Sequence, residues 1–131
     1  MKNIAFLPFL LLCFLGSTPT ATAQADWPEL KTFHGVMAQT FHPMQEGDFQ
    51  PIRQRSGEMV AKAKAVAKSA IPEAYAGKEL AGVVKQLAKD SKALDKLVRK
   101  NGTDEAIGQA LMDLHGVFHE IMGLCSDQED H

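Results

Sequence analysis

The sequence predicts an all-α protein folded as an antiparallel up-down-up-down four-helix bundle. Alanine, lysine, leucine and glutamate dominate, and no alternation of apolar and polar residues lasts long enough for a strand. Four segments instead carry apolar residues at helical spacing, and prolines, glycines or capping residues bound them. Short loops between helices of this length make the first and fourth helices neighbours in such a bundle.

Residues 1–23 have the pattern of a secretory signal peptide. Lys2 supplies positive charge, residues 4–15 form an apolar run too short to span a bilayer comfortably, and Ala21-Thr22-Ala23 fits an A-x-A cleavage site. Cleavage there leaves residues 24–131, which suffice for one domain with a single core. We therefore expect a periplasmic or secreted protein that has no membrane contact once the signal is removed.

The first predicted helix begins near Asp26, which suits an N-cap, with Pro28 in the first turn and Glu29 at the capping-box position. Pro43 is expected to end or kink this helix near His42. Its apolar stripe comprises Leu30, Phe33, Met37 and Phe41.

The second predicted helix begins at Asp48, tolerates Pro51 in its first turn and ends at Pro72. Residues 72–77 read as a loop or short turn. The inner stripe of this helix comprises Ile52, Met59, Ala63, Val66 and Ala70.

The third predicted helix spans residues 78–100, and Asn101-Gly102 closes it as a C-cap. Its lysines at helical spacing indicate a solvated face rather than a binding patch. They are Lys85, Lys89, Lys92 and Lys96. The inner stripe comprises Leu80, Val84, Leu87, Ser91, Leu94 and Val98.

The fourth predicted helix has Thr103 as its N-cap and Asp104 and Glu105 in its first turn, where the helix dipole favours acidic residues. Residues 126–131 read as an acidic, frayed tail. The core stripe comprises Ile107, Leu111, Leu114, Phe118, Ile121 and Cys125.

Charge and cysteine content narrow the choice of partners. Without Lys2, 13 basic residues face 16 acidic ones, and this net negative charge argues against nucleic acid. Signal cleavage also removes Cys13, so Cys125 has no intramolecular partner for a disulfide. We expect Cys125 to lie in the core or to link two chains as a homodimer, rather than to ligate a metal directly.

Histidine and methionine concentrate in two parts of the chain, Phe33 to Asp48 and Leu114 to Cys125. His115 and His119 are four residues apart, the spacing at which two imidazoles on one helix chelate one ion. An H-E-x-x-H pattern is absent because position 123 is glycine, and no other catalytic signature is present. The clusters therefore indicate binding rather than catalysis.

His34, in the first cluster, is the residue expected to share a metal site with histidines of the second cluster. The helical wheel places it close to Phe41, facing the core, and the helix rise places it at about the level of His115. Three imidazoles from His34, His115 and His119, together with Met37, Met122 or water, would form a copper or zinc site. The alternative is that these histidines are structural and hydrogen-bonded.

A second group lies further along the first cluster. His42 and Glu46, with Met44 and Asp48, could coordinate a separate ion. They could equally form a loop whose side chains cap the second helix, and we favour this interpretation.

An exported four-helix chain with its diagnostic site near the end of the last helix resembles the cytochrome c′-like bundles. Members of that family attach haem through CxxCH, whereas the comparable stretch here is LHGVFHEIMGLC, which has one cysteine. The resemblance therefore implies noncovalent haem b rather than covalent haem. Its axial ligands would be His34 or Met37 with His115 or His119.

Three functions follow from these observations. The leading prediction is a periplasmic protein that binds, delivers or buffers copper or zinc. The second is a haem-binding electron carrier, and the third is a non-metal interaction protein or holdase. A hemerythrin-like di-iron site is less favoured because the second and third helices contain no histidine.

Overall fold

The structure, a computed structural model, describes residues 26–76 and 79–126. Within these residues the chain forms four α-helices and one short 3-10 helix, and it has no strand. The elements are α1 (Pro28–Gln45), α2 (Gln50–Lys68), η1 (Glu73–Tyr75), α3 (Leu80–Arg99) and α4 (Asp104–Ser126). The predicted all-α class and the four-helix bundle are confirmed. The predicted signal peptide (1–23) and the tail after Ser126 lie outside the described residues.

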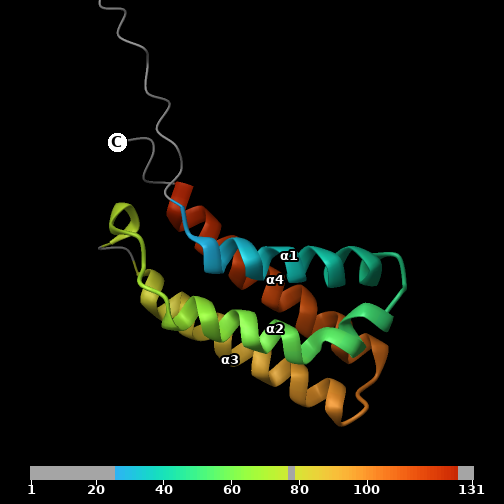
Figure 1. The fold of residues 1–131 in the computed structure, drawn as a ribbon. Coiled ribbons are helices and arrows are strands. Elements are labelled where there is room, and N and C mark those ends of the chain that lie inside the picture. The colour runs from blue at the N-terminus through green and yellow to red at the C-terminus, as the bar shows by residue number, and fades with distance from the viewer. Residues whose placement is uncertain (1–25, 77–78, 127–131) are drawn as a thin grey trace, which may run out of the picture.

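The helices pack around one continuous core (Figure 1). Each helix contacts the next one along the chain, and α1 also contacts α4, although less extensively than the consecutive helices contact each other. The predicted stripe of α4 is entirely buried: Ile107, Leu111, Leu114, Phe118, Ile121 and Cys125. The two helices that carry the described histidines are therefore neighbours, as the sequence predicts.

The start of α1 differs from the prediction. Trp27, not Asp26, occupies the N-cap position, and no side chain caps the helix. The Trp27 indole is buried, and its Nε1 donates a hydrogen bond of 2.8 Å to Ser69 Oγ at the end of α2. Burial of this large side chain draws residue 27 against the core and leaves Asp26 outside the helix.

The end of α1 also differs, because the helix does not stop at His42. Pro43 lies in its last turn, and the helix continues to Gln45. The Pro43 carbonyl accepts hydrogen bonds from the amides of Glu46 and Asp48, at 3.0 and 2.9 Å, and Gly47 follows with a φ of +86°. Pro43 has no amide hydrogen, so it cannot donate the helical hydrogen bond to the carbonyl of Gln39, four residues earlier.

The second helix ends earlier than its proline suggests. Ser69 leaves α2 in an extended conformation with a ψ of 152°, so Ala70 is exposed rather than buried. The Ser69 hydroxyl donates to the Val66 carbonyl at 2.7 Å and accepts the Trp27 indole. The predicted short turn after this helix is present as η1.

The connection from α3 to α4 forms as predicted. Asn101 adopts a left-handed φ of 57°, and the amides of Asn101 and Gly102 donate to the carbonyls of Val98 and Leu97, a Schellman motif. Thr103 Oγ1 then accepts the Ala106 amide at 3.1 Å and so caps α4.

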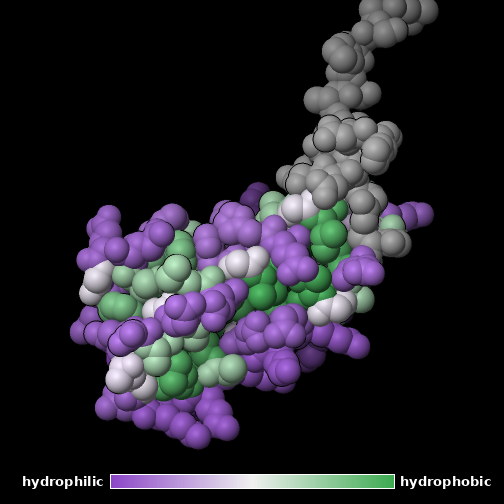
Figure 2. All heavy atoms as spheres, turned by 180° about the vertical axis from the view of Figure 1, so that it is seen from behind, coloured by the Kyte–Doolittle hydropathy of each residue, from purple (hydrophilic) through white to green (hydrophobic). Residues whose placement is uncertain are grey.

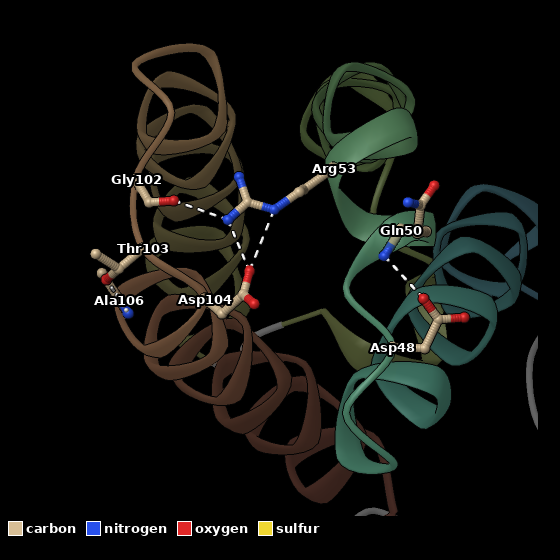
Figure 3. A network of polar contacts seen from close by, with 7 residues as sticks. All are labelled: Asp48, Gln50, Arg53, Gly102, Thr103, Asp104 and Ala106. Carbon is tan, nitrogen blue, oxygen red and sulfur yellow. Dashed lines mark hydrogen bonds and ion pairs between the residues drawn. The ribbon is translucent and has the colours of Figure 1, made fainter.

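Arg53 of α2 bonds to the connection between α3 and α4 (Figure 3). Its Nη2 donates to the Gly102 carbonyl at 2.8 Å and forms an ion pair with Asp104 at 2.7 Å. The ion pair is partly exposed and contributes little by itself. Its effect is to fix the position of the N-terminus of α4 relative to α2.

Gly102 is required by close packing. A Cβ atom at this position would lie 2.7 Å from Leu97 Cδ1 and 3.0 Å from the Leu97 carbonyl oxygen. We expect Gly102→Ala to lower the free energy of unfolding by about 1–3 kcal/mol, measured by urea denaturation. In contrast, Gly82→Ala on α3 meets no atom within 4 Å and should raise it by about 0.5–1 kcal/mol. Equal effects of the two substitutions would contradict this account.

Candidate metal centre

The ring of His115 is held against α1 by stacking. His115 lies on α4, and its imidazole stacks on Phe41 with ring centroids 3.9 Å apart and planes 12° apart. Phe41 is buried in the core, whereas His115 is half-buried. One face of the imidazole is therefore fixed by packing while part of its edge still reaches solvent.

His115 and His119 form the most suggestive pair of side chains. Their Nε2 atoms are 3.1 Å apart, and their rings are nearly perpendicular, at 84°. An ion bound to both nitrogens at about 2.0–2.1 Å would subtend an N–metal–N angle of about 100°, which suits tetrahedral or square-planar coordination. Without an ion, one neutral imidazole can donate a hydrogen bond to the other. The predicted i, i+4 pair is thus brought together.

His34 does not face the core as predicted. It is exposed, and its ring stacks on Phe118 with centroids 4.9 Å apart and planes 15° apart. The ring of Phe118 also contacts His119 edge to face, at 5.9 Å. His34 lies at the border of the apolar stripe of α1, where Phe118 covers one face of its ring and solvent reaches the rest.

The two predicted methionine ligands have different environments. Met37 is 1% exposed and packs in the core, so it serves as a core residue. Met122 is partly buried and lines a cavity together with His34 and Cys125. Neither His115 nor His119 lines that cavity.

The group around His42 separates into unrelated interactions. His42 is exposed and meets the edge of the Phe41 ring at 6.1 Å. Asp48 Oδ1 accepts the Gln50 amide at 3.0 Å, but Phe49 occupies the N-cap position of α2 and no side chain caps that helix. Glu46 is exposed in the turn. In the part of the chain that the structure describes, no group of three or more His, Cys, Asp or Glu residues is placed to hold a metal ion.

Burial and neighbouring charge both act on His115. Desolvation lowers its pKa, and the charges of His119, His42 and His34 lower the pKa further. His34 and His42 of α1 are thus both close enough to His115 of α4 to act on its charge. A lowered pKa favours the neutral imidazole, which is the form that binds a metal ion.

Cys125 was predicted either in the core or between chains, and it is buried, with 2% exposure and no disulfide partner. Burial raises the pKa of its thiol. Sequence reasoning missed that Cys125 shares a cavity with His34 and Met122. The available signal was its i, i+3 spacing from Met122.

No known family model, curated protein or solved structure matches this chain. The resemblance to cytochrome c′-like bundles therefore stays a prediction from architecture. None of the helices within the described residues is both long and apolar enough to cross a membrane.

The lowered pKa of His115 predicts a pH-dependent stability. Because its pKa is lower in the folded than in the unfolded chain, the unfolded chain binds more protons as the pH falls through 6.5, the ordinary value for histidine. We expect the free energy of unfolding to decrease between about pH 7.5 and about pH 5, and His115→Asn to flatten that decrease. Urea titrations across this range measure both. An unchanged slope in the variant would contradict the assignment.

Proposed function

We propose that this protein is an exported, periplasmic four-helix bundle that binds copper or zinc through His115 and His119. Its role would be binding, delivery or buffering of the ion rather than catalysis. The observation that carries the proposal is the 3.1 Å separation of the two Nε2 atoms. The proposal takes the bundle as antiparallel, in line with its short connections.

The pair is prepared for an ion in two ways. Stacking on Phe41 restricts the rotation of the His115 ring, so less side-chain entropy is lost when an ion binds. Burial and nearby charge favour neutral His115, so binding does not have to displace a proton from a charged imidazole. Both effects increase affinity without a third protein ligand.

Two imidazoles leave coordination positions open. Structural zinc sites are almost always closed by four protein ligands, whereas this pair has no third His, Cys, Asp or Glu beside it among the described residues. Water, or a ligand from a receiving protein, would complete the shell, as delivery requires. Copper(II) is favoured over zinc because it binds nitrogen ligands more tightly in the Irving–Williams order.

The two alternatives receive less support from the contacts. Haem b ligated by Met37 would require the core face of α1 to open, since Met37 is almost fully buried. An axial pair from His34 and His115 would have to form while each ring is stacked on a phenylalanine. A holdase would use an exposed apolar surface, and among the described residues Met112 is the large exposed apolar side chain.

Isothermal titration of the mature chain, residues 24–131, with copper(II) and zinc tests this proposal. We expect one ion per chain, and a loss of affinity of about 100-fold or more in His115→Asn and in His119→Asn. His42→Asn is the matched control, because His42 is a histidine of α1 that does not belong to the His115/His119 pair. This variant should change the affinity by less than about threefold. If neither ion binds, or if the pair variants bind like the wild type, the proposal fails and the interaction-protein alternative is favoured.

A further inference from the structure

A cavity of about 350 Å³ opens at the end of the bundle where α1 begins and α4 ends. Part of its wall consists of apolar side chains that belong to the core: Trp27, Leu30, Tyr75 and Phe118. The charged residues Asp26 and Lys31 also line it. Viewed from behind, hydrophobic side chains reach the surface beside the residues drawn in grey (Figure 2). A volume of this size and an apolar lining are typical of small-ligand sites.

Three metal-binding side chains line the cavity: His34, Met122 and Cys125. Met122 and Cys125 are three residues apart on α4, so their Cβ atoms are neighbours at about 5–6 Å. His34 comes from α1, and its ring is held by stacking on Phe118. Residues with thioether, thiol and imidazole groups, from two helices, thus line one cavity.

The two sulfur donors favour one class of ion. Thiolate and thioether sulfur select soft ions such as copper(I), whereas carboxylate and water favour hard ones. Cys125 is 2% exposed, so water has little access to its sulfur. Cys125 is a free thiol, so it remains available to a metal.

We propose that this cavity is a second metal site, specific for a soft monovalent ion, with copper(I) held by Cys125 Sγ, Met122 Sδ and a ring nitrogen of His34. It rests on the proposed function in taking metal binding as the role of the chain, and it adds an oxidation state and a ligand set. On binding, the Cys125 S–H bond breaks, a sulfur–copper bond forms and the proton passes to solvent. The copper keeps its charge, so no oxidant or reductant takes part.

The two sites lie along the same contact between α1 and α4. The ring of Phe118 touches His34 at the cavity and His119 of the imidazole pair. Copper(II) would bind the nitrogen pair and copper(I) the sulfur-containing cavity. The chain could therefore hold copper in either oxidation state.

Anaerobic competition between the mature chain and the chromophoric copper(I) chelator bathocuproine disulfonate, with ascorbate present, tests the inference. We expect the wild type to withdraw one copper(I) ion per chain. Met122→Leu and Cys125→Ser should each weaken that binding at least about tenfold, and His34→Asn should weaken it less strongly. Met112→Leu, on an exposed side chain of the same helix, is the control and should bind like the wild type.

The outcomes separate this inference from the proposed function. Copper(I) binding that survives His119→Asn but is lost in Met122→Leu supports the cavity site, whatever the result with copper(II) and zinc. Binding that persists in both Met122→Leu and Cys125→Ser overturns it, even if the imidazole pair binds copper(II). Met122 is partly exposed and the leucine substitution conserves volume, so this variant stays informative if Cys125→Ser fails to fold.

Discussion

Ring stacking between α1 and α4 fixes the positions of the His34 and His115 imidazoles, on which both proposed metal sites depend. These two helices contact each other less extensively than the other neighbouring pairs. Where they meet, Phe41 stacks on His115 and Phe118 stacks on His34. Each such ring pair adds about 0.5–1.5 kcal/mol beyond the area that it buries. The imidazoles therefore help to hold the helices together, and the phenylalanines fix the imidazoles in turn.

This arrangement separates the two proposed sites by chemistry. Stacking leaves the Nε2 edge of His115 directed at His119, where a borderline ion such as copper(II) or zinc would be bound by nitrogen. Near His34, the contact between α1 and α4 borders the cavity that Met122 and Cys125 also line. Sulfur there would select a softer ion. The cavity site takes its ligands from both α1 and α4, so bundle stability and copper(I) affinity should be coupled.

Local patterns predicted most of the fold, and contacts distant in sequence account for the errors. The Thr103 cap and the buried stripe of α4 could be predicted because each depends on residues within a few positions. The boundaries at Trp27 and Ser69 could not, because Trp27 is buried against the core and bonded to Ser69, 42 positions away.

For the candidate site, helical spacing predicted that His115 and His119 would meet. The orientation of His34 depends on Phe118, which belongs to another helix, and a helical wheel of α1 contains no information on that contact.

The NMR spectrum of the imidazole ¹⁵N nuclei during a zinc titration tests most directly whether His115 and His119 bind one ion together. We expect the Nε2 resonances of His115 and His119 to shift together and saturate at one zinc ion per chain, while those of His42 stay in place. A shift of only one of the pair, or of neither, would contradict it.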